Sequence, residues 1–304
     1  MSKLRFLISL ITRENDYQVE QAAAGLATAK EIGVEADIVY ADNDPITQST
    51  QVLKAIQAEP SQRPNGIIIE PLGATAFPQA AQAAVSAGIG WAVLSRRAEY
   101  AKEFGKSART PVFSVSVDQV EVGRIQARQV MALLPRGGSV LFIQGPSVSS
   151  VSKERHDGLM ELLPGNVHLT NLRGRWTEES AYQSVCSWFR LMTAQKARID
   201  LVLAQNDVMG MGARKAIEET VTGPDRDDWL EVPITGVDGV LKTGQAWVTS
   251  GKLAATVIVP ASSGKALRLM AEALWKGTSI AEHIYTSPTA FPEIAKLTPQ
   301  SPKE

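Results

Sequence analysis

The sequence predicts an α/β protein built from two doubly wound, parallel-sheet lobes. Short apolar segments typical of strands alternate with helical segments along nearly the whole chain, which is the pattern of repeated βα units with right-handed crossovers. Some of these strands are purely apolar, such as Gly66–Ile69, as expected for strands covered on both faces. The 304 residues hold more βα units than one sheet of ordinary size accommodates, so we predict two lobes.

The first series of elements begins with a strand at Leu4–Ile11, and a helix at Tyr17–Ile32 ends at Gly33, a residue that favours helix C-caps. The later strands expected in this series are Glu35–Tyr40, Gly66–Ile69, Trp91–Leu94 and Val112–Val117. The helices between them are Ile46–Ala58 and Phe77–Ala87, and a polar stretch follows at Arg96–Arg109.

The second series starts with a helix at Val120–Leu134 that ends before Pro135 and the Gly137–Gly138 pair. Its expected strands are Ser139–Ile143, Val167–Leu172, Leu201–Ala204, Val232–Val237, Leu253–Val259 and Glu282–Thr286. Its expected helices are Ser149–Leu163, Glu178–Ala194, Val208–Thr220, Leu241–Ser250 and Ser262–Trp275. Because Pro288–Glu304 is rich in proline and polar residues, we predict a loosely packed extension there.

Composition excludes several classes of function. The 31 Lys and Arg residues balance 32 Asp and Glu residues, so there is no basic excess for coating nucleic acid. One cysteine, Cys186, and three scattered histidines give no zinc-ligand spacing. No apolar run approaches the roughly 20 residues that cross a bilayer.

Motifs for common catalytic chemistries are also missing. No glycine-rich dinucleotide motif follows the first strand, where Thr12–Asp16 stands. Gly105-Lys-Ser107 lacks the first glycine of a phosphate loop, and Gly145–Ser149 does not match a nucleophile elbow. We therefore expect a binding protein without a catalytic residue, cofactor or metal, rather than an enzyme.

The N-terminal segment Met1–Ile11 combines a basic residue with apolar residues, as a secretory signal does. Arg5 interrupts the apolar part, charged and polar residues follow at Arg13–Asp16, and no small-residue cleavage site comes after them. We interpret the segment as a buried strand, so that the chain as given is either a mature-like form or a cytoplasmic protein.

Polar residues follow apolar strands at two corresponding points. Glu70 follows Gly66–Ile69, and Asn206-Asp207 follows Leu201–Ala204. The carboxyl ends of strands are where open α/β sheets bind ligands. Helix capping is the alternative interpretation for Asn and Asp, whereas Glu is a poor capping residue.

Five motifs follow one another along the chain, namely Leu94-Ser-Arg96, Lys153-Glu-Arg155, Ala204-Gln-Asn-Asp207, Thr235-Gly-Val-Asp238-Gly239 and Gly251–Thr256. Taken in this order, they resemble those of the periplasmic sugar-binding proteins of the ribose-binding, type I solute-binding family. Proteins of that family feed ABC transporters and chemoreceptors. The resemblance covers nearly the whole chain and implies two lobes, residues 1–117 plus 260–285 and 118–259 plus 286–304, that close around a small hydroxylated ligand. It places the three crossings between the lobes near Ser116–Asp118, Val259–Ala261 and Tyr285–Ser287.

The resemblance also implies a set of ligand-binding residues. Arg96 and Arg155 match arginines whose planar forks donate paired hydrogen bonds. Asn206 matches an asparagine that both donates and accepts, Asp238 matches a carboxylate, and Trp176 matches a ring that stacks on the sugar. The alternatives are surface ion pairs for the two arginines and a partly buried loop aromatic for Trp176.

The chain departs from the family pattern at several of these positions. Ser95 stands where an acid is usual, Glu70 where Asn or Asp is usual, and Val237 and Val259 replace a common aromatic and a hinge glutamine. Tyr17 is the best remaining ring after the first strand. These departures argue against ribose itself, so we expect a sugar, a polyol or a sugar-like molecule. Glu70 and Asp238 suit a polyol or an aminated or cationic molecule, whereas Arg96, Arg155 and Arg97 favour neutral or anionic groups, so the ligand's charge stays open.

The expected partners are that small molecule and an ABC transporter permease or a sensor receptor, with the protein acting as a monomer. The resemblance implies a periplasmic location, and a cytoplasmic sensing module of the same fold is the alternative. A regulator of the lactose-repressor type would need a DNA-binding segment of about 60 residues before the first strand, which begins near Leu4. An enzyme would reveal itself by turnover or by a catalytic dyad.

Overall fold

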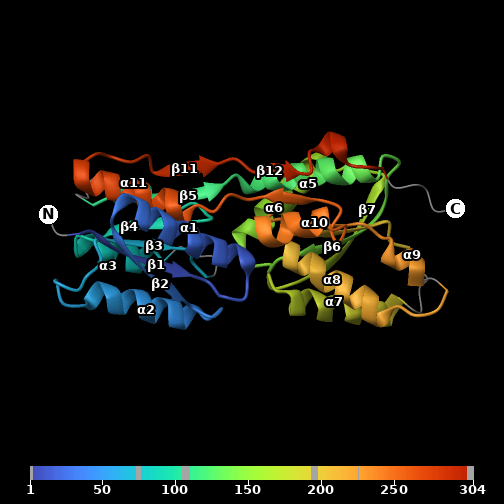
Figure 1. Ribbon diagram of the computed structural model, residues 1–304, viewed down its shortest axis with the longest axis horizontal. Helices are drawn as coiled ribbons and strands as arrows, with labels where there is room; N and C mark the ends of the chain where they lie inside the picture. The colour runs from blue at the N-terminus through green and yellow to red at the C-terminus, as the bar shows by residue number, and fades with distance from the viewer. Residues whose placement is uncertain (1–2, 73–76, 105–109, 193–197, 225, 300–304) are drawn as a thin grey trace. The chain divides into compact units, whose positions relative to one another are not determined.

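The computed structural model describes residues 3–72, 77–104, 110–192, 198–224 and 226–299 (Figure 1). The chain divides into two compact units, Met1–Val117 with Pro260–Thr286, and Asp118–Val259 with Ser287–Glu304. Thr286 belongs to the first unit rather than to the second, because it is the last residue of a strand in the first unit's sheet. Each unit is an α/β lobe around a parallel sheet, as the sequence predicts.

The sheet of the first unit has six parallel strands in the order β11-β5-β4-β3-β1-β2. The strands are β1 (Arg5–Leu10), β2 (Glu35–Tyr40), β3 (Gly66–Ile69), β4 (Gly90–Leu94), β5 (Val112–Val117) and β11 (His283–Thr286). This order brings the carboxyl ends of β1, β3 and β4 side by side. Loops that follow these three strands therefore share one edge of the sheet.

Helices cover both faces of this sheet (Figure 1). They are α1 (Asp16–Ile32), α2 (Pro45–Gln57), α3 (Pro78–Ser86), α4 (Ala101–Phe104) and α11 (Ser263–Lys276). Ile68 packs into the core shared with α1 and α11, whereas Ile67 and Ile69 pack into the core shared with α2 and α3. The purely apolar sequence of β3 is explained by this burial on two faces.

The second unit has a four-stranded parallel sheet in the order β7-β6-β8-β9. Its strands are β6 (Gly138–Gln144), β7 (Val167–Arg173), β8 (Leu201–Ala204) and β9 (Ile234–Thr235). Its helices are α5 (Gln119–Leu133), α6 (Ser150–Leu162), α7 (Glu178–Met192), α8 (Asp207–Thr220), α9 (Arg226–Leu230), and a π-helical turn at Leu241–Gln245 that leads into α10 (Ala246–Thr249). The core again lies on both faces.

The end of the chain is packed, and the prediction of a loose extension is wrong for its described part. Strand β12 (Thr289–Phe291) pairs antiparallel with β10 (Thr256–Ile258), and a 3-10 turn follows at Ile294–Lys296. Leu297 then packs against the core formed with α5 and α6. The residues after 299 lie outside the described part of the chain.

Several element boundaries also differ from the sequence prediction. The strands expected at Val232–Val237 and Leu253–Val259 are shorter in the structure, where β9 covers Ile234–Thr235 and β10 covers Thr256–Ile258. Gly236 follows β9 directly, and β10 pairs with the short strand β12 over three residues. The polar stretch at Arg96–Arg109 contains the short helix α4, and its residues 105–109 lie outside the described ranges. The expected helix at Glu178–Ala194 is described as far as Met192.

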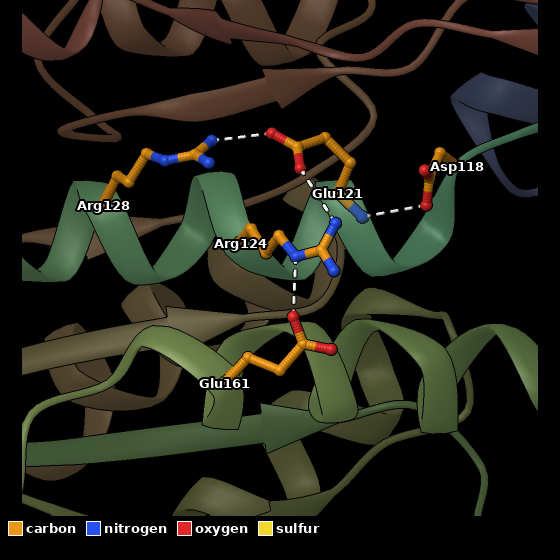
Figure 2. Close-up of polar contacts among 5 residues, drawn as sticks. All are labelled: Asp118, Glu121, Arg124, Arg128 and Glu161. Atoms are coloured by element: carbon orange, nitrogen blue, oxygen red, sulfur yellow. Dashed lines mark hydrogen bonds and ion pairs between the residues drawn. The ribbon is translucent and has the colours of Figure 1, made fainter.

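Helices α5 and α6 pack at very close range through two glycines. A Cβ atom added at Gly158 would lie 2.8 Å from the carbonyl carbon of Val120, and one at Gly123 would lie 2.7 Å from the backbone nitrogen of Leu159. Ion pairs reinforce this contact (Figure 2): Arg124 Nε lies 2.7 Å from Glu161 Oε2 across the two helices. Asp118 caps α5 by accepting from the backbone N–H of Glu121.

Within the described ranges, no helix is both long and apolar enough to cross a membrane. The same ranges hold no group of three or more His, Cys, Asp or Glu side chains arranged for a metal ion.

Candidate functional site

The predicted residues of the first unit gather at the shared carboxyl edge of its sheet. Glu70 directly follows β3, and Ser95 and Arg96 directly follow β4. Tyr17 lies in the first turn of α1, just beyond the loop that follows β1. Since β1, β3 and β4 are neighbours in the sheet, parallel-sheet topology places these four residues together.

Glu70 is the buried centre of this group. Its carboxylate accepts hydrogen bonds from Ser95 Oγ at 2.9 Å and from Gln21 Nε2 at 3.3 Å. Its backbone is fixed too, because its N–H donates to the Ser9 carbonyl and its carbonyl accepts from Gln48 Nε2 at 2.8 Å. Burial raises the pKa of Glu70, against the hydrogen bonds from Ser95, Gln18 and Gln21 and the positive charge of Arg96.

Tyr17 is held beside Glu70 through a shared partner. Asn15 begins α1 by accepting from the Tyr17 backbone N–H at 2.9 Å, which is ordinary N-capping. The Tyr17 hydroxyl lies 3.2 Å from Gln21 Nε2 and 3.5 Å from the Pro260 carbonyl. Arg96 is half-buried and acts electrostatically on Glu70. The four predicted residues of this unit therefore form one polar group.

In the second unit, Arg155 projects from α6 and is only 4% exposed. Its Nε donates to Gln119 Oε1 at 2.8 Å, and a terminal nitrogen donates to the Gln205 carbonyl. The alternative of a surface ion pair is wrong for Arg155, because the residue is buried. The α5–α6 glycine contact sets its position, since Gln119 lies on α5.

Trp176, in the loop between β7 and α7, packs on the backbone of Gly145. A Cβ atom at Gly145 would lie 2.7 Å from Trp176 Cε2, so a larger residue there would require the indole to shift. The Trp176 carbonyl accepts from Asn206 Nδ2 at 3.2 Å, and its ring lies 5.7 Å from the Arg155 guanidinium carbon. The indole is half-buried.

Asn206 is almost completely buried and caps α8. Its Oδ1 accepts from the Met209 backbone N–H at 3.0 Å, so the capping interpretation holds for this residue. Because Nδ2 also reaches the carbonyl of Trp176, the side chain links α8 to the Trp176 loop. Its position at the end of β8 is the one the sequence predicts.

Asp238 and Asp207 form an acidic pair beside Arg155. Asp207 accepts from Thr256 Oγ1 at 2.6 Å and from the Gly239 N–H at 2.8 Å. Burial and then the charge of Asp238 raise the pKa of Asp207 well above its usual value, while the hydrogen bonds and Arg155 oppose this shift. The apolar strand followed by Asn-Asp signals Asp207 in the sequence, although Asp207 is outside the predicted set.

Three of the eight predicted residues have an unusual backbone. Ser95 and Trp176 have φ of 65°, and Asp238 has φ of 113°. Such left-handed conformations cost non-glycine residues about 1–3 kcal/mol and concentrate at functional sites. Asp42, Asn43 and Phe77 also have positive φ, so the predicted residues account for half of the non-glycine residues with this conformation in the described part of the chain.

Each unit thus presents a carboxylate, an arginine and an aromatic ring at the carboxyl edge of its sheet. Arginine donates in pairs and ionised carboxylates only accept, so each set suits a small molecule that carries several hydroxyl groups. Sequence reasoning misses the buried amides that fix these groups, namely Gln18, Gln21, Gln119 and Gln205.

Comparison with known proteins agrees with this architecture. A family model described as a periplasmic binding protein domain matches residues 6–279. The chain is 29% identical over 280 residues to the xylitol-binding protein of Mycolicibacterium smegmatis, covering 89% of this chain and 72% of that protein. It is 26% identical over 250 residues to the ribose import binding protein RbsB of Bacillus subtilis, covering 82% of this chain and 74% of the relative.

Among solved structures, the periplasmic binding protein component of the arabinose ABC transporter from Shewanella sp. ANA-3, bound to α- and β-L-arabinofuranose, superposes with a TM-score of 0.80. The two chains are 21% identical, and the match covers 96% of this chain and 93% of the other. A likeness at this level of identity establishes the fold.

Proposed function

This chain belongs to the periplasmic binding protein domain family, and we propose that it captures a sugar or polyol and delivers it to an ABC transporter. Two named relatives bind xylitol and import ribose, which supports a ligand of this chemical class. The proposed location is the periplasm, and the proposed working form is a monomer without nucleic-acid partners. The protein binds its ligand without chemical turnover.

One observation carries the proposal: both units place buried, pre-positioned hydrogen-bonding groups at the carboxyl edges of their sheets. Glu70 and Arg96 of the first unit would form hydrogen bonds with the ligand, as would Arg155 and Asp238 of the second. Tyr17 and Trp176 would cover the apolar faces of the sugar ring or of the polyol carbon chain. Leaving a buried hydroxyl unpaired costs about 1–3 kcal/mol. Fixed partners therefore discriminate between epimers.

The mechanism follows from binding by both units at once. A ligand that contacts groups on both units favours the closed arrangement. The free energy by which it shifts the equilibrium is no larger than the difference between its affinities for the closed and open arrangements. The closed form is then the state that a transporter recognises. The named import relatives favour transport over cytoplasmic sensing.

The test is a thermal-shift screen with xylitol, D-ribose, L-arabinose, myo-inositol and glycerol, followed by calorimetry and small-angle scattering. A ligand at 100 times its dissociation constant adds about 2.7 kcal/mol of stability. We expect at least one polyol or sugar to raise the melting temperature and to make the protein more compact. The absence of both effects across the panel would refute the proposal.

Arg155→Lys gives the sharper test. It keeps the charge but loses the fork that bonds Gln119 and Gln205, so we expect affinity to fall at least tenfold, about 1.4 kcal/mol. Arg128→Lys is the matched control, because Arg128 is a surface arginine paired with Glu121 at 2.7 Å. Equal ligand affinity in Arg155→Lys and Arg128→Lys would show that Arg155 does not bind the ligand.

A further inference from the structure

One buried residue of the first unit, Gln21, contacts the candidate site and the N-terminus of α11 at the same time. It lies one turn after Tyr17 on α1 and is fully buried. A buried amide needs partners for both its oxygen and its nitrogen. The partners of Gln21 come from three separate parts of the chain.

The oxygen of Gln21 caps a helix. Its Oε1 accepts from the backbone N–H groups of Ser262 and Ser263, each at 2.9 Å. These two groups stand at the start of α11, where Ser262 makes no capping bond with its own side chain. Ser263 Oγ in turn donates to the Gln21 carbonyl. Gln21 therefore satisfies donors that a helix N-terminus leaves open.

The nitrogen of Gln21 faces the candidate site. Because Oε1 must face two N–H donors, the amide cannot be turned around, and Nε2 must point the other way. There it lies 3.3 Å from Glu70 Oε2, 3.2 Å from the Tyr17 hydroxyl and 3.3 Å from Ser262 Oγ. The helix cap thus decides which end of the amide Glu70 meets.

We propose that Gln21 is a positioning residue of the binding site, which holds the Glu70 carboxylate as a fixed hydrogen-bond acceptor and ties it to the start of α11. The expected effect of Gln21 on sugar or polyol binding rests on the proposed function, whereas its expected effect on the Glu70 carboxylate does not. Gln21 acts through Glu70 and Tyr17 rather than by contact with the ligand.

The surroundings of Glu70 define what a titration would report. Arg96 is the charged side chain that acts on it from the β4 loop, and Tyr17 is the titratable group near it on α1. Ser95 and Gln18 also donate to the carboxylate, and α2 contributes the neutral amide of Gln48 at the Glu70 carbonyl. Removal of one donor raises the pKa of the carboxyl group.

The first experiment needs no ligand. Carboxyl carbon NMR follows the titration of Glu70, assigned by the loss of its signal in Glu70→Gln, in the wild type, Gln21→Met and Gln129→Met. Gln129 is the matched control because it is equally buried and donates to the Thr256 carbonyl in the second unit. We expect the Glu70 midpoint to move to higher pH in Gln21→Met alone. Equal midpoints in all three proteins would overturn the proposal.

The second experiment measures xylitol binding by calorimetry across pH. If an ionised Glu70 accepts ligand hydroxyls, affinity is lost as the pH falls through its pKa. The raised midpoint in Gln21→Met therefore moves this loss to higher pH, and we expect the pH at which affinity is half lost to be higher in Gln21→Met than in the wild type. A merely structural role for Gln21 would lower the melting temperature and leave the pH profile unchanged.

Gln21→Glu separates capping from positioning. The introduced carboxyl group still accepts from Ser262 and Ser263, but it replaces the donor that faces Glu70 with a second acid. We expect a smaller loss of melting temperature than in Gln21→Met, together with weak xylitol binding at neutral pH. Wild-type affinity in Gln21→Glu would contradict the proposal. If the wild type binds no member of the panel, the proposed function fails, and the ligand-free titration still decides the role of Gln21.

Discussion

The guanidinium carbon of Arg155 lies 5.7 Å from the centroid of the Trp176 ring. The two residues come from different elements, α6 and the loop after β7, and this distance permits a cation–π interaction. Arg155 is itself held by Gln119 and Gln205. The guanidinium that faces the Trp176 ring is therefore held in part from α5, through Gln119.

Gly145→Ala tests the packing of the Trp176 ring against Gly145. The added Cβ atom would overlap the indole, so the ring must shift from its present position. We expect xylitol or the best sugar of the panel to bind about tenfold more weakly, a change of about 1.4 kcal/mol. Calorimetry measures this change, and Gly165→Ala is the control because nothing lies within 4 Å of a Cβ atom at Gly165. Unchanged affinity in Gly145→Ala would show that the ring does not contact the ligand.

Gly158→Ala tests the close contact between α5 and α6. A methyl group there meets the backbone of Val120, and backbone cannot turn aside as a flexible side chain can. Overpacking of this kind costs about 1–3 kcal/mol and sometimes more. We expect the free energy of unfolding in urea to fall by at least that amount, while Gly165→Ala stays within about 0.5 kcal/mol of the wild type. Equal stability in both variants would show that the two helices can separate freely.

The buried acid Asp207 predicts a dependence of stability on pH. Burial and Asp238 raise its pKa well above the usual 3.8, so the folded protein binds this proton more tightly than the unfolded chain. The stabilising contribution is therefore complete below the unfolded-state pKa and is lost as the pH rises through the folded-state pKa. We expect the free energy of unfolding of the wild type, minus that of Asp207→Asn, to decrease over this window.

Urea unfolding between about pH 4 and pH 7 measures this difference. Asp227→Asn is the control, because Asp227 is exposed on α9. A difference between wild type and Asp207→Asn that stays constant with pH would show that Asp207 titrates normally in the folded protein.

Leu297→Ala tests the packing of the chain end. Leu297 is partly buried against the core formed with α5 and α6. We expect a loss of about 1–2 kcal/mol in the free energy of unfolding, at the low end for a leucine truncation because the side chain is not fully buried. Lys296→Ala is the control, since its ion pair with Glu293 is exposed and such pairs contribute at most about 1 kcal/mol. Equal stability of the two variants would indicate that the chain end is loosely attached.

The elements that sequence predicts well are those whose burial or capping is indicated by the types of their own residues. Gly66–Ile69 is apolar throughout because both of its faces are covered. Gly33 ends α1 with φ of 75°, a conformation that glycine adopts readily. The polar residues at strand ends, Glu70 and Asn206, follow from the same local pattern.

Features that depend on distant partners are invisible in the sequence. Thr289–Phe291 becomes a strand because β10 offers an open edge, and its own residues are few and only partly apolar. Gln21 resembles any other polar residue of an alanine-rich helix, and its role appears only when residues 262 and 263 are placed beside it. The resemblance to the family predicts Trp176 and Asp238 as ligand-binding residues, but it does not predict the positive φ of either residue.

The order of the chain has a consequence for synthesis of the protein on the ribosome. The sheet of the first unit takes its edge strand β11 from His283–Thr286, and the second unit pairs β10 with Thr289–Phe291. Neither unit can complete its hydrogen-bonded framework until the chain has been synthesised as far as Thr286 for the first unit and Phe291 for the second. Although multidomain chains usually fold their N-terminal domain first during translation, the first unit here cannot add its edge strand β11 before residues 118–259 of the second unit have been made.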